Sequence, residues 1–299
     1  MTKEKFTNYL FQYEIEGLKI SESYVHAASS MKTRHYHETI ELFVLTEGER
    51  YYFVDRFVYH MKKHMALLIS PGQIHKTSAV SGKPEHGRFL LHYSKEVFGT
   101  MIQNCLGISY EEFCLKYSGM ISLSDIGYRR LQDKFLELKE EASKSPDDPD
   151  YSSSIIKCLS FEFLLIFSRE VDKEKAALGI DTTKDSYLVK SGIYNTIQKV
   201  TEYINNNYHS DISLDSLADR FYISRAGLTR SFKNITGITI VQYLTTVRIR
   251  RACNLLKNSS DSITDIAQEC GFGNVTYFEK VFRRIHGMTP RQYRNIPEF

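Results

Sequence analysis

Apolar residues near the C-terminal end of the chain recur at the spacing of buried helix faces, in two copies about fifty residues apart. In each copy a leucine or isoleucine beside an alanine is followed by a polar residue and then by large apolar residues four positions apart. The matching positions are Leu217, Ala218, Ser224, Leu228 and Phe232 in the first copy and Ile266, Ala267, Asn274, Phe278 and Phe282 in the second. We interpret this pattern as a tandem structural repeat.

Each copy predicts a helix, a tight turn and a second helix. Ser213 and Ser224 stand where the two helices of the first copy would begin, and a serine there can accept a hydrogen bond from the first helical turn. Asn274 is the equivalent cap in the second copy. Gly271 precedes it, where the turn needs a residue with a permissive backbone. The repeat therefore predicts two helix-turn-helix motifs.

The second helix of each copy has an outward stripe that is short, polar and mostly basic. It consists of Arg225, Ala226, Thr229, Arg230 and Lys233 in the first copy and Val275, Thr276, Glu279, Lys280 and Arg283 in the second. Such side chains suit base edges and phosphates in a major groove, and although a single stripe could be an ordinary solvated face, two equivalent ones favour DNA. Glu279 could accept from a cytosine or pair with Arg283 four residues later, and we favour the internal pair.

Thr239 to Lys257, between the copies, predicts one long helix of about 27 Å at 1.5 Å per residue. A rigid spacer of that length could set two recognition helices into successive major grooves, roughly 34 Å apart, if the DNA bends. Arg248, Arg250 and Arg251 lie on this helix, and we expect structural pairing or solvation for them.

The run from Ile193 to Arg294 resembles the DNA-binding domain of the AraC/XylS family of transcription regulators. The resemblance rests on the pairs Gly271-Phe272 and Tyr277-Phe278 and on the closing G-x-T-P-x-x-Y-R of Gly287 to Arg294. It implies double-stranded DNA and RNA polymerase as partners, and activation rather than repression. The DNA-facing positions that it implies are Arg225, Ala226, Thr229 and Arg230 in the first helix and Asn274, Val275, Thr276, Glu279 and Lys280 in the second.

Charge is unevenly distributed along the 299 residues, whose formal net charge is +3. Residues 193–299 hold 14 Lys and Arg against 9 Asp and Glu, or +5, while the rest holds 25 against 27, or −2. The repeat-bearing part is therefore the basic part, as phosphate binding requires. The chain lacks a run of 18 apolar residues, a secretory signal pattern and C-x-x-C spacing among its 5 cysteines, so we expect a cytoplasmic protein with reduced cysteines and no membrane partner.

The N-terminal part has short apolar runs rich in β-branched and aromatic residues, with turn signals at Glu47-Gly48 and Pro71-Gly72. The expected strands are Leu18–Val25, Leu42–Leu45, Tyr51–Val54, Phe57–Tyr59, Ala66–Ile69, Lys76–Val80 and Phe89–Tyr93. Many short strands joined by brief turns predict an antiparallel barrel or jelly roll.

This part resembles the cupin-type sensor domain found in AraC-family regulators, through His35, His37 and Glu41 in H-x-H-x3-E spacing and Pro71-Gly72 before His75. Two histidines two positions apart point to one face of a strand, so the four side chains could converge on a transition metal. We favour an effector pocket instead, comprising His35, His37, Glu41, Tyr52 and His75, and predict no cofactor. Several tyrosines (Tyr36, Tyr51, Tyr52, Tyr59, Tyr93) suggest a sugar as the effector.

Helical spacing returns between Ser122 and Val171, in two segments separated by a polar SPDDPD loop. The apolar positions are Leu131, Phe135, Leu136 and Leu138 in the first segment and Ile155, Ile156, Leu159, Phe163, Leu164 and Phe167 in the second. The pair could cover the barrel or, as the family resemblance implies, form a homodimer interface. The polar stretch after it reads as a linker.

The predicted fold class is multidomain α+β. The domains are a cupin-like effector-binding domain (1–121), a helical cap or dimerisation segment (122–172), a linker (173–192) and a double helix-turn-helix domain (193–299). The predicted function is effector-controlled, sequence-specific transcription regulation, not enzyme catalysis. The alternatives are a metal-dependent cupin enzyme with a DNA-binding tail and a ligand-independent regulator whose barrel is a scaffold.

Overall fold

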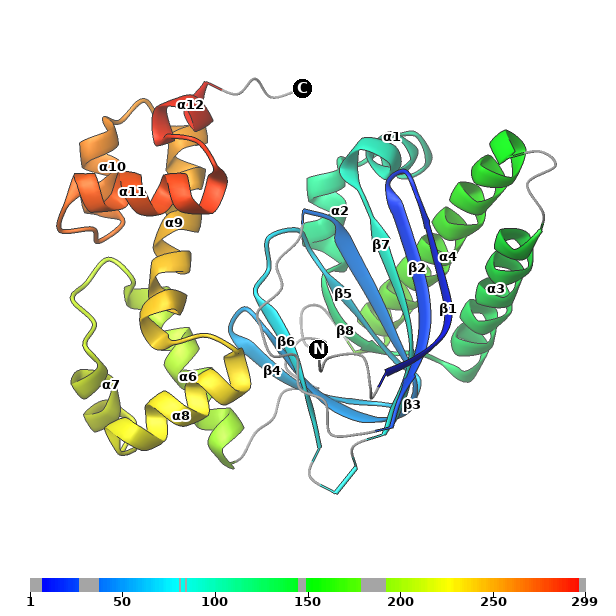
Figure 1. The fold of residues 1–299 in the computed structure, drawn as a ribbon, viewed down its shortest axis with the longest axis horizontal. Coiled ribbons are helices and arrows are strands. Elements are labelled where there is room, and N and C mark those ends of the chain that lie inside the picture. The colour runs from blue at the N-terminus through cyan, green and yellow to red at the C-terminus, as the bar shows by residue number, and fades with distance from the viewer. Residues whose placement is uncertain are drawn as a thin grey trace. The chain divides into compact units, whose positions relative to one another are not determined.

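The structure is a computed structural model that describes residues 7–26, 38–80, 82–83, 85–144, 149–178 and 192–295. The chain divides into two compact units, Met1–Lys190 and Ser191–Phe299 (Figure 1). The described part of the N-terminal unit combines antiparallel strands with helices, and that of the C-terminal unit consists of helices and their connections. The predicted fold class, an antiparallel β domain followed by an all-α domain with two helix-turn-helix motifs, is confirmed.

The N-terminal unit is built on a sheet in which every described strand pair is antiparallel. The strands are β1 (Thr7–Ile15), β2 (Leu18–Val25), β3 (Ile40–Val54), β4 (Phe57–Lys62), β5 (Met65–Ile69), β6 (His75–Ala79), β7 (His86–Tyr93) and β8 (Gly119–Ser122). Their order is β1-β2-β7-β3-β5-β8, with β4 and β6 also paired to β3. The expectation did not include β1, because this edge strand is mostly exposed or half-buried and so carries a weak hydrophobic signal.

The long strand β3 serves two sets of neighbours. Its first half pairs with β5 and β7, and its second half with β4 and β6. The turn predicted at Glu47-Gly48 is wrong, because β3 continues through it with a bulge between Leu45 and Glu47. Gly48 has φ +79°, and a Cβ there would overlap the backbone oxygen of Glu85.

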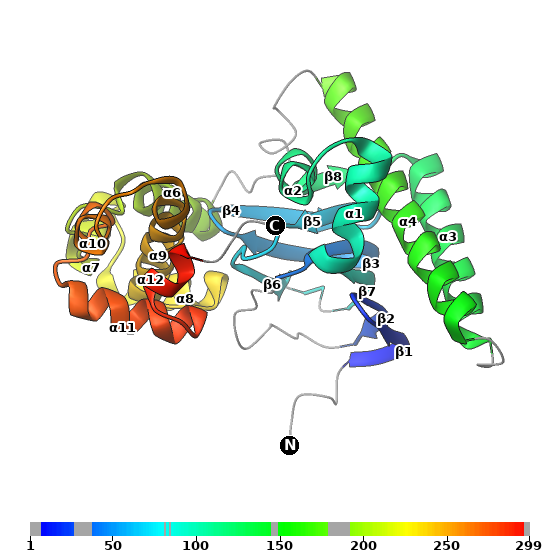
Figure 2. The same cartoon turned by 90° about the horizontal axis from the view of Figure 1, so that it is seen from above.

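Four helices follow β7 in the described part of this unit, with β8 between the second and the third. They are α1 (Lys95–Leu106), α2 (Tyr110–Tyr117), α3 (Asp125–Ser143) and α4 (Pro149–Leu178). Helices α3 and α4 lie side by side against the sheet (Figure 2), and their apolar faces bury the outer side of β2, β3 and β7. The helices α1 and α2 were not predicted from the sequence.

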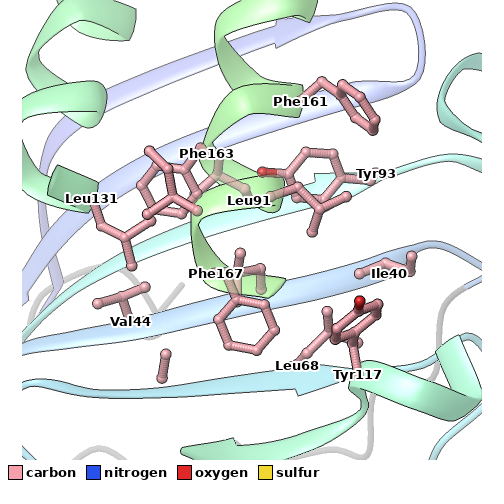
Figure 3. Packing of buried hydrophobic residues seen from close by; sticks show 14 of the residues in the cluster. Ile40, Val44, Leu68, Leu91, Tyr93, Tyr117, Leu131, Phe161, Phe163 and Phe167 are labelled. Atoms are coloured by element: carbon pink, nitrogen blue, oxygen red, sulfur yellow. The ribbon is translucent and has the colours of Figure 1, made fainter. Parts of the chain in front are cut away.

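The core between the sheet and α4 is packed with aromatic and branched side chains (Figure 3). Phe163 and Phe167 of α4 and Val44 of β3 are fully buried there. One hydrogen bond joins β7 to α4 within this core, since the hydroxyl of Tyr93 donates to the backbone oxygen of Ser160 at 3.0 Å. Two of the expected apolar positions differ, because Leu136 is 51% exposed and Ile155 is 44% exposed.

Helix α4 is longer than the pattern predicted. It continues through Leu178, so the linker predicted at 173–192 is wrong for residues 173–178. The extension is held by Glu174, which accepts from the Ser122 backbone N–H at 3.1 Å, and by Lys175, which donates to the Lys116 backbone oxygen at 2.6 Å. Of the remaining linker residues, 179–191 lie outside the described part of the chain, and Gly192 begins the next described helix.

Part of α4 is also apolar enough to compare with a membrane span. By length and composition alone Tyr151–Ala177 could cross a membrane, with a mean hydropathy of 1.3 in its most apolar window, 44% of which is buried. Phe163, Leu164 and Phe167 are fully buried in the N-terminal unit. We therefore interpret α4 as a core helix of this unit.

The C-terminal unit contains the two predicted helix-turn-helix motifs. Its helices are α6 (Gly192–Asn207), α7 (Leu214–Arg220), α8 (Arg225–Thr236), α9 (Ile240–Asn258), α10 (Ile263–Glu269), α11 (Val275–His286) and α12 (Pro290–Arg294). The predicted caps are present, since Ser213, Ser224 and Asn274 each accept a backbone N–H from the first turn of the following helix. The motifs are α7–α8 and α10–α11.

Helix α9 contributes to the cores of both motifs. Tyr243, in its first half, packs edge-on against Phe232 of α8, with ring centroids 5.6 Å apart. Its second half joins a separate cluster around α10 and α11 that includes Ala252, Leu256 and Phe282. Each motif therefore buries its apolar stripe against a different half of one helix.

The turn of the second motif requires a glycine at position 271. Gly271 has φ +80°, and a Cβ there would lie 2.8 Å from the backbone oxygens of Tyr208 and His209. We expect Gly271→Ala to destabilise the C-terminal unit by about 1–3 kcal/mol. Native-state hydrogen exchange of the α10 and α11 amides in the full chain would measure the loss. Gly273→Ala is the matched control, because a Cβ at Gly273 meets no atom within 4 Å; equal exchange in the two variants would contradict the prediction.

Candidate nucleic-acid interface and buried polar cluster

The outward face of α8 carries the first predicted stripe. Arg225, Ala226, Thr229, Arg230 and Lys233 are all exposed. Leu228 and Phe232, on the other side, are fully buried. The helix begins where the Ser224 hydroxyl accepts from the Gly227 N–H at 3.2 Å and ends at Gly237, which is left-handed. Capping and burial thus fix which side chains α8 presents.

The face of α8 is hollowed rather than flat. Its five predicted side chains, with Asn234, line an open depression of about 630 Å³. Arg225 reaches back to Asp215 of α7 at 3.2 Å, but both side chains are 66% exposed, so the pair is screened by water. The Thr229 hydroxyl donates to the Arg225 backbone oxygen at 2.8 Å. Asn234 was missed, although it follows Arg230 by one helical turn.

Helix α11 presents the second stripe in the same way. Thr276, Glu279, Lys280 and Arg283 are exposed. Val275 is only half-exposed, because it packs against the core of the second motif. In residues 192–295 no ion pair joins Glu279 to Arg283, so the internal pair that we favoured is wrong in the structure. Spacing of four residues permits such a pair, but the gain of a few tenths of a kcal/mol does not enforce it.

Asn274 has a structural role beside its predicted one. Its side-chain oxygen accepts from the Tyr277 backbone N–H at 2.9 Å and so caps α11. The side-chain amide nitrogen is the part of Asn274 that could donate to DNA. Tyr277, which is 53% exposed on α11, was not among the predicted positions. In the sequence it counted only as part of the Tyr277-Phe278 pair of the family resemblance.

A cluster of polar side chains lies buried in the N-terminal unit, between the two halves of β3. It contains three of the predicted pocket residues, Glu41, Tyr52 and His75. Nε2 of His75 lies 3.5 Å from Oε2 of Glu41, and their side chains are 1% and 6% exposed. Sequence reasoning missed His92, whose Nε2 lies 3.9 Å from the same oxygen of Glu41. Its approach depends on the register in which β7 pairs with β3.

The contacts of His75 favour its protonated form. Nδ1 lies 3.0 Å from the backbone oxygen of Gln73, which can only accept, so Nδ1 carries a proton. Nε2 then faces the Glu41 carboxylate and interacts best when it is protonated too. Burial lowers the pKa of His75, but the Glu41 carboxylate outweighs that effect with help from the Gln73 carbonyl, and the net pKa is raised.

The cluster also includes Arg50, which lies near the predicted pocket residue Tyr52. Burial raises the pKa of Tyr52, and the nearby Glu41 carboxylate raises it further, so the phenol stays protonated. Arg50 was missed; it is 1% exposed, and its Nε donates to the Thr77 hydroxyl at 3.0 Å. Burial lowers the pKa of Arg50 to about 10, opposed by Tyr52 and assisted by the guanidinium of Arg88.

The structure describes two of the four residues that could bind a metal, Glu41 and His75. His35 and His37 lie outside the described residues. Within the described residues, no group of three or more His, Cys, Asp or Glu side chains is arranged to hold a metal ion.

The Glu41–His75 pair predicts a pH-dependent stability. Because the folded pKa of His75 is raised, its stabilisation is fully present below the ordinary histidine pKa of about 6.5 and is lost as the pH rises through the folded value. Glu41→Gln should therefore lower the free energy of unfolding by roughly 1–3 kcal/mol near pH 6 and by less near pH 9. Urea denaturation followed by circular dichroism would measure both.

The matched control for this prediction is Glu47→Gln. Glu47 lies on the same strand, but its side chain is 54% exposed and pairs with Lys63 at the surface. We expect little change from it at either pH. An identical loss for Glu41→Gln at both pH values would show that charge on His75 is not involved.

Comparisons with known proteins match both units. A family model described as an AraC-like ligand binding domain matches residues 23–149, and one described as a helix-turn-helix domain matches residues 217–296. The HTH-type transcriptional activator RhaS from Citrobacter koseri is 35% identical over 98 residues, which cover 33% of this chain and 35% of that protein. RhaS from Yersinia pestis is 37% identical over 99 residues, covering 33% and 36%. The chain thus spans about a third of the length of these relatives.

Solved structures also match. The DNA-binding domain of AdpA, crystallised with a target DNA, is 33% identical over 32% of this chain and 86% of that chain, with a TM-score of 0.31. ToxT from Vibrio cholerae is 12% identical over 93% of this chain and 97% of that chain, with a TM-score of 0.38. With an AraC-like ligand binding domain ahead of a helix-turn-helix domain similar to those of RhaS proteins, the chain belongs to the AraC family.

Proposed function

We propose that the protein is a sequence-specific DNA-binding transcription regulator. The observation that carries the proposal is the pair of exposed polar faces on α8 and α11, each on the second helix of its motif and each capped by a polar side chain. The second helix of a helix-turn-helix motif enters the major groove. Two such faces in one unit would read two adjacent groove segments.

The exposed side chains divide by chemistry into base readers and phosphate contacts. Arg230, near the middle of α8, can bind a guanine through two parallel hydrogen bonds. Glu279, which is not paired with Arg283, can accept from a cytosine amino group. Lys233 and Arg283 lie in the last turns of their helices and suit phosphates, which would make the affinity salt-dependent.

Helix α9 supports a two-groove arrangement. At 1.5 Å per residue its 19 residues span about 27 Å from the first Cα to the last, somewhat less than the roughly 34 Å of one DNA turn. Both recognition helices could then dock only if the DNA bends towards the protein. Bending of this kind adds sequence preference at base pairs that no side chain touches.

We further propose that the N-terminal unit binds a small-molecule effector and that the protein acts in the cytoplasm as an activator. The activator role rests on the similarity to the RhaS relatives, which are HTH-type transcriptional activators and align with 33% of this chain. Recruitment of RNA polymerase follows from that role. We propose a homodimer through α3 and α4, supported by the exposed Leu136 and Ile155 on those helices.

A sugar is the effector class that we propose. Among the described tyrosines that suggested it, only Tyr52 and Tyr59 lie in the buried cluster between the halves of β3, which could bind a sugar. Tyr93 instead faces α4, and the ring of Tyr51 lies tilted beside that of His60, with centroids 5.0 Å apart. Glu41, His75 and Thr77 add acceptors and donors suited to sugar hydroxyls.

One observation favours a second candidate, a ligand-independent regulator whose β domain is a scaffold. Much of the interior between the two halves of β3 is occupied by the protein's own apolar side chains. They are Phe43, Leu45, Tyr52, Val54, Tyr59, Met61, Leu67, Ile69 and Met120. An effector would have to bind beside this cluster or displace part of it.

DNA binding by the full chain to its own upstream region, at two salt concentrations and with a panel of sugars, fatty acids and divalent metals, tests the proposal. We expect specific binding that weakens steeply with salt and that one member of the panel shifts. Specific binding that responds to no ligand would favour the scaffold. Absence of any sequence preference would contradict the regulator itself.

Arg230→Ala tests the assignment of a base reader. Loss of a bidentate contact should weaken binding to the preferred DNA by roughly 1–3 kcal/mol and relax the preference at one base pair. Fluorescence anisotropy with the preferred DNA and single-base variants would measure both effects.

Arg56→Ala is the matched control, since Arg56 is an exposed arginine in the turn between β3 and β4 and its loss changes the net charge equally. We expect binding within about twofold of the wild type for this variant, as for a screened surface charge. A uniform loss on every DNA sequence in Arg230→Ala would reassign Arg230 to a phosphate.

A further inference from the structure

The two helix-turn-helix motifs have separate apolar cores, so a second set of contacts must fix the angle between them. One core gathers around α6, α7, α8 and the first half of α9, and the other around α10, α11 and the second half of α9. Helix α9 sets the distance between the two motifs. A single helix can bend and twist, so α9 alone does not fix the angle between them. Contacts near the midpoint of α9 restrain this angle.

Arg248 lies at the midpoint of α9 and reaches into the first motif's half of the unit. Its Nε donates to the backbone oxygen of Tyr208 at 2.8 Å, and its Nη2 donates to that of Ser210 at 2.9 Å. Both oxygens belong to the connection between α6 and α7. A planar guanidinium can donate in two fixed directions at once, which a lysine ammonium on a flexible stem does not reproduce.

The same guanidinium also touches the second motif. Its Cζ lies 5.8 Å from the ring centroid of Phe272, in the turn between α10 and α11. The neighbouring Gly271 packs so closely that a Cβ would lie 2.8 Å from the Tyr208 and His209 oxygens. Arg248 therefore stands where the α6–α7 connection meets the turn of the second motif.

We propose that Arg248 is a positioning residue that fixes α11 relative to α8 and so sets the spacing between the two DNA segments that the protein recognises. The inference rests on the proposed DNA-binding function. Arg248 acts through the two helices rather than on a base. Its half-buried guanidinium is matched to two carbonyl oxygens and an aromatic face, the environment of a structural arginine.

Electrostatics around Arg248 agree with a structural role. Burial lowers the pKa of Arg248, and the carboxylate of Asp211 in the same connection opposes that change. The group remains charged at neutral pH, because the ordinary arginine value is above 12. Its two carbonyl contacts are therefore charge-assisted and stronger than neutral hydrogen bonds.

The test compares Arg248→Met with Arg251→Met in the full chain. Methionine keeps much of the unbranched stem and removes the guanidinium. Arg251 is exposed on the same helix, so its replacement matches the change in charge. The DNA is first selected from a random pool with the wild-type protein. Three DNAs are then made. The first has both half-sites at the selected spacing, the second has one half-site scrambled, and the third has one base pair inserted between the two half-sites.

We expect Arg248→Met to bind the two-half-site DNA about tenfold more weakly, because simultaneous engagement of both motifs depends on their geometry. Binding to the single half-site should stay within about twofold, and the preference for the selected spacing over the inserted one should shrink. Arg251→Met should behave as wild type on all three. A melting curve checks that Arg248→Met is folded.

Two outcomes would overturn the inference. Equal weakening on all three DNAs would make Arg248 a phosphate contact or a general stability residue. Unchanged binding and spacing preference would mean that α9 and the two cores hold the geometry without it. Failure of the wild-type protein to select any sequence would instead contradict the proposed function, so the two failures are distinguishable.

Discussion

The C-terminal unit depends on one constraint, which is that neither helix-turn-helix motif can bury its apolar stripe alone. Each motif contributes two short helices and completes its core with one half of α9, joined by α6 in the first motif. Burying Leu228 and Phe232 in one core and Phe278 and Phe282 in the other leaves the opposite faces of α8 and α11 in solvent. The polar faces are thus a consequence of core packing, and their function follows from the residues that occupy them.

In the N-terminal unit the corresponding constraint lies in β3. A strand of 15 residues cannot pair along its whole length with one flat neighbour here, and the bulge after Leu45 divides it between two sets of partners. Phe43 from one half and Tyr52 from the other then meet with ring centroids 4.9 Å apart. Glu41 lies on the first half of β3, and His75 lies on β6, which pairs with the second half, so the polar cluster forms between the two sets of partners.

Local features were predictable from the sequence, and contacts between distant residues were not. The helix starts at Ser224 and Asn274 follow from capping, which involves only the next three residues. The extension of α4 could not be predicted, because Glu174 and Lys175 bind backbone groups more than fifty residues away. His92 likewise joins the cluster only through strand register. The site faces were predictable because a helix face is a local property.

The turns of the two motifs illustrate how the repeat has diverged. Both need a left-handed residue after the first helix, and the first copy uses Tyr222, with φ 52° and a side chain 98% exposed. The second copy uses Gly271, which faces backbone oxygens instead of solvent. A side chain is tolerated where the turn is open, at a strain of about 1 kcal/mol, and excluded where the turn packs against the α6–α7 connection. The sequence difference between the copies therefore marks the contact surface between the motifs, and Arg248 lies at its centre.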